Sequence, residues 1–157
     1  MKKSSPPIDK LVSGGQTGVD RAALDAALEL GIPCGGWCPK GRWSESGVIA
    51  PVYPLRETPS EDVAQRTEWN ARDSDGTLVI AEGSPVGGTA LTVDMAARYR
   101  KPCLILDALK IPENARDSVR TWIARNQIRA LNVAGPREST TPGIYKAARA
   151  LLRTVLR

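Results

Sequence analysis

The chain has 157 residues, of which 41% are hydrophobic and 25% charged, and its net charge at pH 7 is +5. This length predicts one α/β domain over residues 1–157. The chain has no apolar run near the ~20 residues that a membrane helix needs, and it has no apolar signal segment at its start. We therefore expect a cytoplasmic protein. The chain has no histidine, which excludes histidine-based triads, imidazole metal ligands and histidine general bases. It has three cysteines, and this odd number fits a reducing compartment.

The first predicted unit is a short apolar strand, a glycine-rich bend and a helix. Residues 11–18 form the strand and the bend, and apolar residues on one face predict a helix over Val19–Leu30 that ends at Gly31. Thr17 with Asp20 predicts a capping box at the helix start. A glycine-rich bend ahead of a helix exposes backbone N–H groups at the positive end of the helix dipole, so this unit predicts a phosphate site.

The second part of the chain combines a brief strand, a long irregular segment and a helix. The strand is predicted from Pro33 to Trp37, and the segment Cys38–Glu57 that follows has no clean period. A loop of about 20 residues within a compact domain is usually either functional or wrongly assigned as a loop. Residues 58–61 (Thr-Pro-Ser-Glu) combine an N-cap, a proline at the first helical position and a capping-box acid, so a helix is predicted from there to Asp73.

Three further strand–helix units complete the chain. Their predicted strands are Thr77–Ala81, Cys103–Leu106 and Ala130–Ala134. Their predicted helices are one that leaves the loop Glu82–Thr89 and ends near Arg100, one over Pro112–Asn126 and one that begins at Thr141. Strands that alternate with helices in this way predict a mainly parallel sheet of about five strands, with helices on both faces.

Three polar loops follow predicted strands, and we expect them to meet. They are Gly14–Gly18, Gly83–Thr89 and Gly135–Thr141. The carboxyl ends of parallel strands lie along one edge of a sheet, and each loop precedes a helix whose first N–H groups are unpaired. Arg21 and Arg137 lie at or just beyond two of these loops and have the guanidinium geometry that suits phosphate oxygens. The expected ligand is therefore an anion.

These loops supply the candidate site residues. The residues expected to bind the phosphorylated ligand are Gly14, Gly15, Gln16, Thr17, Gly18, Asp20, Arg21, Gly87, Gly88, Thr89, Arg137 and Ser139. The backbone N–H groups expected to hold the phosphate are those of Gly15, Thr17, Gly18, Gly88 and Thr89. No residue is assigned as catalytic, and no metal site is expected, because the cysteines do not have the spacing of a metal-ligand set.

Two other segments each allow two interpretations. Arg66, Asn70 and Asp73 share a face of their predicted helix, which is either a solvated face or one that leans over the ligand edge. The segment Cys38–Glu57 is interpreted as a lid, in which Lys40, Arg42 and Trp43 would offer charge and a stacking surface to the ligand. The alternative for this segment is a permanent subunit contact.

Four phrases of the sequence identify a family. They are SGGQTGVDRAA (13–23), RTEWNARDSDG (66–76), GGT (87–89) and NVAGPRES (132–139). Together they resemble the molybdenum-cofactor carrier protein family, which belongs to a Rossmann-like superfamily that also includes the lysine-decarboxylase-like phosphoribohydrolases. The resemblance implies a Rossmann-like three-layer sandwich, a homo-oligomer, and a pocket for a nucleotide or for the pterin phosphate of the molybdenum cofactor.

One departure bears on catalysis. When Gly88 and Thr89 are aligned with the Gly-Thr of the phosphoribohydrolase loop, Thr92 occupies the position of the catalytic glutamate in those relatives. The resemblance therefore favours a binding or carrier protein for a phosphorylated small molecule over an enzyme. The alternative is a nucleoside-monophosphate hydrolase in which Asp20 or Glu82 acts as the acid or base.

The composition also limits the partners. Lysine and arginine residues are scattered along the chain, so we do not expect nucleic acid as a partner, and we expect no membrane partner. The three cysteines are the only soft metal ligands, so any molybdenum is expected to arrive already held by an organic cofactor.

Overall fold

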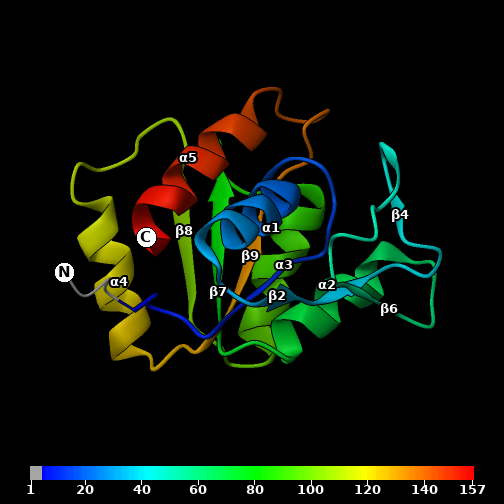
Figure 1. The fold of residues 1–157 in the computed structure, drawn as a ribbon, viewed down its shortest axis with the longest axis horizontal. Helices are drawn as coiled ribbons and strands as arrows, with labels where there is room; N and C mark the ends of the chain where they lie inside the picture. The colour runs from blue at the N-terminus through cyan, green and yellow to red at the C-terminus, as the bar shows by residue number, and fades with distance from the viewer. Residues whose placement is uncertain (1–4) are drawn as a thin grey trace.

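The computed structural model describes residues 5–157. The predicted domain 1–157 and the expected lack of an apolar signal segment also include residues 1–4, which lie outside this range. Its centre is a five-stranded sheet in the order β2-β1-β9-β7-β8, in which every pair of neighbours is parallel (Figure 1). The five strands are β1 (Lys10–Val12), β2 (Cys34–Gly35), β7 (Gly76–Ala81), β8 (Cys103–Asp107) and β9 (Ala130–Ala134).

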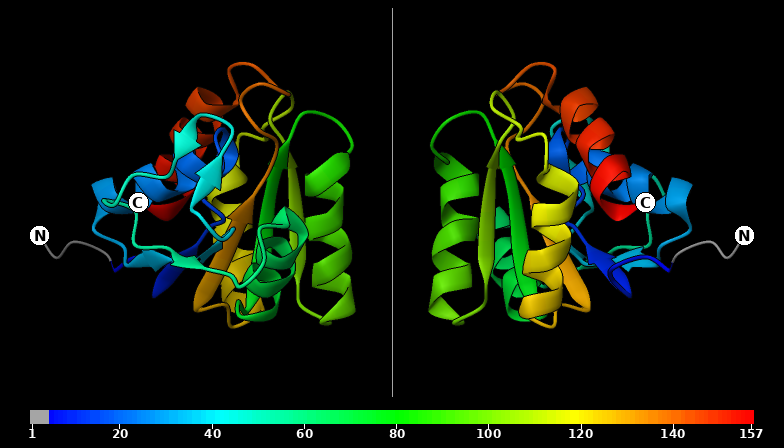
Figure 2. Two further views of the ribbon diagram at one scale, coloured as in Figure 1. Left: turned by 90° about the vertical axis from the view of Figure 1, so that its right-hand side faces the viewer. Right: turned by 90° about the vertical axis from the view of Figure 1, so that its left-hand side faces the viewer.

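Five helices cover the two faces of this sheet. They are α1 (Val19–Leu30), α2 (Val63–Arg72), α3 (Gly87–Arg98), α4 (Ala115–Arg125) and α5 (Ile144–Leu156). Helices α1, α4 and α5 pack together on one face, and α2 and α3 pack together on the other (Figure 2). The three-layer α/β fold is therefore as predicted.

Local sequence signals explain the best-predicted elements. Helix α1 has the predicted bounds, and Gly31 ends it in the left-handed conformation at φ 71°. In α5, the apolar residues spaced along one face of the helix are buried: Ile144, Ala148, Leu151, Leu152 and Val155. All six residues of β7 are buried because this central strand has helices on both faces.

Several predicted helix starts are wrong. The start at residues 58–61 is displaced to Val63, with Asp62 as the N-cap, because the Thr58 N–H still donates to the carbonyl of Cys38 and holds the chain extended. Helices α4 and α5 likewise begin three residues later than predicted, at Ala115 and Ile144.

Two other local predictions also need correction. Gly18 is the N-cap of α1 and no side chain caps this helix, so the capping box of Thr17 and Asp20 is not formed. The predicted strand Pro33–Trp37 is interrupted by Gly36 at φ 129° and divides into β2 and β3 (Trp37–Cys38). No helix within residues 5–157 has the length and apolar character to cross a membrane.

The segment predicted to be irregular contains short strands. Strand β3 pairs in parallel with β6 (Arg56–Glu57), and β4 (Trp43–Ser44) forms an antiparallel hairpin with β5 (Gly47–Val48). Ile49 and Leu55 of this segment are buried in the core. The segment is thus anchored in the core by these two side chains.

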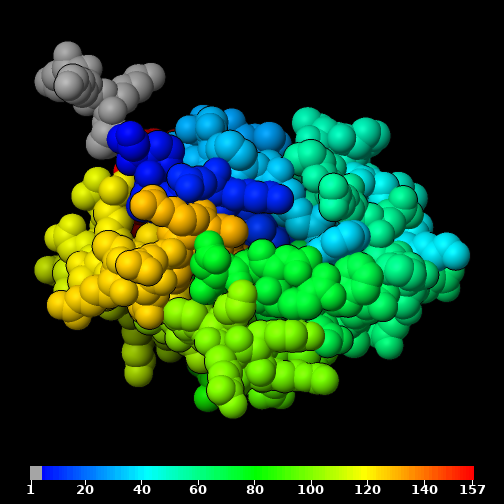
Figure 3. Space-filling model, turned by 90° about the horizontal axis from the view of Figure 1, so that it is seen from below, coloured from blue at the N-terminus to red at the C-terminus, as the bar shows by residue number. Residues whose placement is uncertain are grey.

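The amino ends of the strands form a closed end of the molecule. There, Asp75 Oδ2 accepts hydrogen bonds from the N–H groups of Arg129 (3.0 Å) and Ala130 (2.8 Å), and Lys101 Nζ donates to the Ser74 carbonyl at 2.6 Å. Figure 3 shows this end from below, with residues near 75 in green beside residues near 130 in orange. The carboxyl ends of the strands, at the opposite end, are the ones that leave a cavity.

Candidate functional site

A cavity of about 270 Å³ opens where β1, β7 and β9 end, between α2 and α3. The three polar loops meet there, as their positions after parallel strands predicted. Seven of the twelve predicted site residues line the cavity: Gly14, Gln16, Asp20, Gly87, Gly88, Thr89 and Arg137. The other five do not: Gly15, Thr17, Gly18, Arg21 and Ser139.

The first glycine-rich loop is hydrogen-bonded to itself. The N–H of Gly15 donates to Ser13 Oγ at 3.3 Å, and the N–H of Thr17 donates to Gln16 Oε1 at 3.0 Å. The N–H of Gln16 donates to Asp20 Oδ2 at 3.2 Å. These backbone donors therefore have acceptors in the loop or in the first turn of α1. The expectation that Gly15 and Thr17 hold a phosphate through their N–H groups does not fit this conformation.

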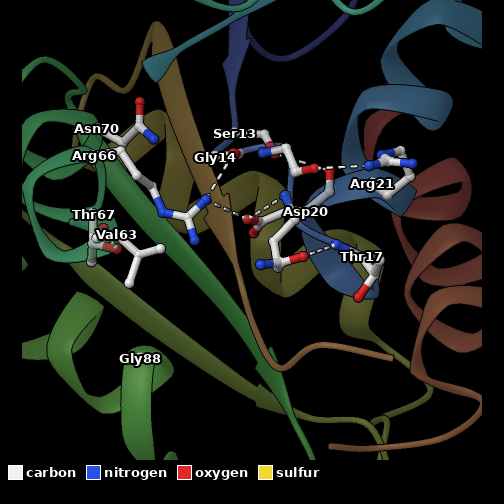
Figure 4. Close-up of polar contacts among 12 residues, drawn as sticks. Ser13, Gly14, Thr17, Asp20, Arg21, Val63, Arg66, Thr67, Asn70 and Gly88 are labelled. Carbon is white, nitrogen blue, oxygen red and sulfur yellow. Dashed lines mark hydrogen bonds and ion pairs between the residues drawn. The ribbon is translucent and has the colours of Figure 1, made fainter. Parts of the chain in front are cut away.

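A buried arginine from α2 reaches the cavity wall opposite this loop. Arg66 Nη1 donates to the Gly14 carbonyl at 2.7 Å and lies 3.7 Å from Asp20 Oδ2 (Figure 4). Arg66 and Asn70 line the cavity, so for them the interpretation that this helix face leans over the ligand edge is the correct one. Asp73 lies outside the cavity, where its carboxylate accepts from Trp37 Nε1. The sequence signals for Arg66 were the shared helix face and its place at the start of the phrase 66–76.

Asp20 is a buried carboxylate in the same wall. Burial raises the pKa of Asp20 to about 6, although the charge of Arg66, the N–H of Gln16 and the charges of Arg21 and Arg137 act to lower it. Its Oδ1 makes no hydrogen bond within residues 5–157, since only Oδ2 accepts, from Gln16. A carboxyl with this pKa changes its charge near neutral pH.

The second glycine-rich loop is open. No atom of the described residues, 5–157, would lie within 4 Å of a Cβ added at Gly87 or Gly88. Val86 is the N-cap of α3, and its carbonyl accepts from the N–H groups of Thr89 and Ala90, whereas no acceptor within residues 5–157 bonds to the N–H groups of Gly87 and Gly88. Two unpaired donors at the positive end of a helix dipole suit an anion.

Gln16 adds a third kind of donor. Its Oε1 accepts hydrogen bonds from the N–H groups of Thr17 (3.0 Å) and Glu45 (2.9 Å), which fixes the orientation of the amide. Its Nε2 is consequently held in the cavity wall, buried and without a partner among the described residues. A buried N–H group with no acceptor costs free energy, so this geometry indicates an acceptor that a ligand would supply.

Arg137 lies in the cavity wall beside the β4–β5 hairpin. Its guanidinium carbon is 5.3 Å from the centre of the Trp43 ring, and the guanidinium makes no hydrogen bond within residues 5–157. The Glu45 carboxylate at the hairpin tip accepts from Thr17 Oγ1 and from both the N–H and the hydroxyl of Ser139. Those hydrogen bonds, led by that of Ser139, lower the pKa of Glu45. Thr17 and Ser139 therefore hold the hairpin and do not line the cavity.

Two predicted charge partners point elsewhere. Arg21 Nη2 donates to the Gly15 carbonyl at 3.0 Å and its guanidinium stacks on Tyr53 at 5.0 Å, on the far side of the loop from Arg66 (Figure 4). Arg42, from the predicted lid, uses four of its five donors on the carbonyls of Ile49, Ala50, Tyr53 and Leu55. Lys40 is exposed and lies outside the cavity wall. Arg42 is thus occupied by protein carbonyls, whereas Arg21 lies outside the cavity wall although its Nε has no partner among the described residues.

The arrangement is therefore a cavity whose donors come from several elements: the backbone of α3, the side chain of Gln16, and the guanidinium groups of Arg66 and Arg137. Among residues 5–157, no group of three or more cysteine, aspartate or glutamate side chains is placed to hold a metal ion. Such a set of donors can bind an oxyanion.

Comparisons with known proteins identify the family of the chain. A crystal structure of a protein from Syntrophus aciditrophicus SB, named "Putative molybdenum carrier protein", is 48% identical to this chain, with a TM-score of 0.94 over 98% of each chain. No curated protein matches the chain. The family model described as "Circularly permutated YpsA SLOG family" matches residues 11–156. The resemblance seen in the four phrases is thereby confirmed, and the chain belongs to the circularly permutated YpsA family of the SLOG superfamily.

Proposed function

We propose that this protein binds or carries a phosphorylated small molecule, with the phosphate between Arg66 and the first turn of α3. The observation that carries the proposal is the convergence of donors without protein acceptors on one cavity. They are the N–H groups of Gly87 and Gly88, Gln16 Nε2 and the guanidinium of Arg137. Arg66 adds a second guanidinium, in which only Nη1 has a protein acceptor within residues 5–157. Phosphate oxygens are acceptors, so one phosphate can satisfy donors from several of these groups.

The remainder of the ligand would lie along the apolar part of the wall. Val63 of α2, and Val86 and Leu91 at the start of α3, line the cavity beside these donors. A nucleotide and the pterin phosphate of the molybdenum cofactor both combine a phosphate with a flat ring, and the name of the Syntrophus protein supports the second. None of the three cysteines lines the cavity, so molybdenum would come as cargo held by the organic cofactor.

Binding measurements test this proposal. Isothermal titration of the full chain with AMP, GMP and isolated molybdenum cofactor should detect binding to at least one of them, and the corresponding nucleosides without phosphate should bind at least about tenfold more weakly. Arg66→Met should weaken binding by a similar factor, whereas Arg116→Met, on the exposed surface of α4, should leave it unchanged. Equal affinity for a nucleoside and its monophosphate would contradict the phosphate site.

A hydrolase is the second candidate function, and Asp20 is the observation that favours it. A buried carboxyl with a pKa of about 6 in a cavity wall suits general acid–base chemistry near neutral pH. Thr92, at the position of the relatives' glutamate, has no acidic group, and its hydroxyl donates to the Gly88 carbonyl at 3.1 Å. Release of free base from nucleoside monophosphates, lost in Asp20→Asn, would establish this activity. Binding without release of base would support the carrier function.

A homo-oligomer is also part of the proposal. Strand β8 is an edge of the sheet, and Ile105 on it and Leu109 and Ile111 just after it are exposed apolar residues. Such residues are suited to a contact between copies of the chain. Light scattering coupled to gel filtration measures the mass directly, and a mass equal to that of one chain would contradict this part.

A further inference from the structure

Asp20 is the one buried carboxylate in the donor-lined wall of the cavity, and its surroundings are unusual for that group. The residue is only 7% exposed. Its Oδ2 accepts one hydrogen bond, from the Gln16 N–H, and lies 3.7 Å from Arg66 Nη1, which is beyond hydrogen-bonding distance. Its Oδ1 has no hydrogen bond among residues 5–157. The carboxylate is therefore weakly compensated for a buried charge.

The protonation state of Asp20 determines how the cavity would receive an anion. An ionised carboxylate only accepts hydrogen bonds, so it would repel a phosphate and compete with it for Arg66. A protonated carboxyl can donate through its O–H, and it leaves the charge of Arg66 to the anion. The same side chain thus opposes the bound anion in one state and assists it in the other.

We propose that a tetrahedral dianion, such as the phosphate group of a monoester, enters the cavity together with one proton, which Asp20 takes up. This inference rests on the function proposed above. The proton comes from the solvent and binds to a carboxylate oxygen of Asp20, and no covalent bond to the ligand forms or breaks. The complex then holds the dianion beside Arg66 and Arg137, with the neutral carboxyl of Asp20 in the same cavity wall.

The charged groups around Asp20 come from every element that packs there. Arg66 on α2, Arg21 on α1 and Arg137 in the β9–α5 loop all favour its ionised form. Glu82, after β7, is the other carboxylate that lines the cavity, and it is exposed. The three arginines are present with and without ligand, so the bound dianion is the change that shifts the proton equilibrium of Asp20.

The sign of the pH dependence follows from this linkage. In the free protein, burial raises the pKa of Asp20 to about 6, and a bound dianion would raise that pKa further. Affinity for the dianion should therefore be highest below pH 6 and should fall as the pH rises above 6, where binding must draw a proton from solution. The fall stops once the pH exceeds the pKa of Asp20 in the complex.

Sulfate is the appropriate probe, because it stays a dianion over this pH range. Titration calorimetry of the full chain with sulfate at pH 7, in two buffers that differ in ionisation enthalpy, should give uptake of roughly one proton per sulfate bound. The Kd for sulfate should be about tenfold weaker at pH 8 than at pH 6. These two measurements test the inference on the unmodified chain.

Variants then locate the proton. Asp20→Asn should abolish proton uptake and should bind sulfate at pH 8 more tightly than the unmodified chain. Glu82→Gln, which changes the exposed carboxylate of the cavity, and Asp117→Asn, on the exposed surface of α4, should both retain proton uptake. Loss of uptake in Glu82→Gln with its retention in Asp20→Asn would overturn the assignment.

The remaining outcomes separate this inference from the proposed function. Sulfate binding without proton uptake would overturn the inference and leave the proposed function standing. Binding of AMP without any binding of sulfate would overturn it as well, because the dianion site would then be absent. If neither sulfate nor any phosphorylated ligand binds, the proposed function itself fails.

Discussion

The loop of residues 13–18 and the loop of residues 82–89 both join a buried strand to a helix, yet their glycines have opposite surroundings. Gly15 and Gly18 both have φ 77°. A Cβ added at Gly15 would lie 2.5 Å from Leu55 Cδ1, and one added at Gly18 would lie 2.3 Å from the Pro136 carbonyl oxygen. At Gly87 and Gly88 an added Cβ would meet no atom within 4 Å. The first loop is packed and the second is open.

The difference shows that glycines after a strand serve two separate purposes. In the first loop they allow the chain to turn and other segments to approach its backbone, and the N–H groups of Gly15, Gln16 and Thr17 have acceptors in or next to the loop. In the second they leave backbone donors exposed to the cavity. The fate of the N–H groups, more than the presence of glycine, therefore distinguishes a packing turn from an anion site.

The largest expected effect is that of Gly18→Ala. The substitution should lower the free energy of unfolding by at least about 4 kcal/mol, because it combines a strained positive φ with a clash against a backbone carbonyl that cannot move aside. Urea unfolding followed by circular dichroism measures it. The matched change in the open loop, Gly88→Ala, should leave stability unchanged or raise it by up to about 1 kcal/mol. Similar losses in both variants would remove the distinction between the loops.

Arg66→Met tests the contact that joins the packed loop to the cavity. At pH 8 it should lower the free energy of unfolding by about 3 kcal/mol, because it leaves the buried carboxylate of Asp20 without its ion-pair partner. The loss should be smaller at pH 5, where Asp20 is protonated and needs no cation. Urea unfolding at pH 8 and pH 5, with Arg116→Met as the control, measures the loss of unfolding free energy at each pH. An equal loss at the two pH values would show that Arg66 acts through packing alone.

Asp20→Asn should change how stability depends on pH. The folded pKa of Asp20, about 6, is above its ordinary value of 3.8, so between these values the folded state binds more protons than the unfolded state, and ionisation of Asp20 costs stability as the pH rises. From pH 4 to pH 7 the unmodified chain should lose about 2 to 3 kcal/mol relative to Asp20→Asn. Urea unfolding across this range gives the difference, and parallel pH profiles for the two proteins would contradict it.

The smallest expected effect is that of Glu45→Gln at the tip of the hairpin. Its partly exposed carboxylate joins Thr17 and Ser139, so the free energy of unfolding should fall by less than about 1 kcal/mol. Hydrogen exchange of residues 43–48 should nevertheless become faster, because the hairpin loses its contact with both loops. Glu61→Gln, an exposed change before α2, should alter neither quantity. A loss above 2 kcal/mol would mean that the packed loop depends on the hairpin.

The sequence by itself determined the layers of the fold and the edge at which the loops meet. Apolar periodicity and a glycine at the C-terminus gave α1 its bounds, and the alternation of apolar strands with helices predicted the parallel sheet. These signals are local, because period and caps depend on residues a few positions apart. The predicted start of α2 failed because the Thr58 N–H finds its acceptor twenty residues away, at the Cys38 carbonyl.

Only the tertiary structure decided which predicted site residues line the cavity. Arg66 lies 52 residues from Gly14 along the chain, and Glu45 lies 94 residues from Ser139. These contacts nevertheless determine which hydrogen-bonding groups of the site residues already have a protein partner. Arg21 belongs to the matching phrase but contacts Tyr53, which the folded segment brings beside it. The physical reason is that a donor's availability depends on every acceptor near it in space, and the sequence orders residues only along the chain.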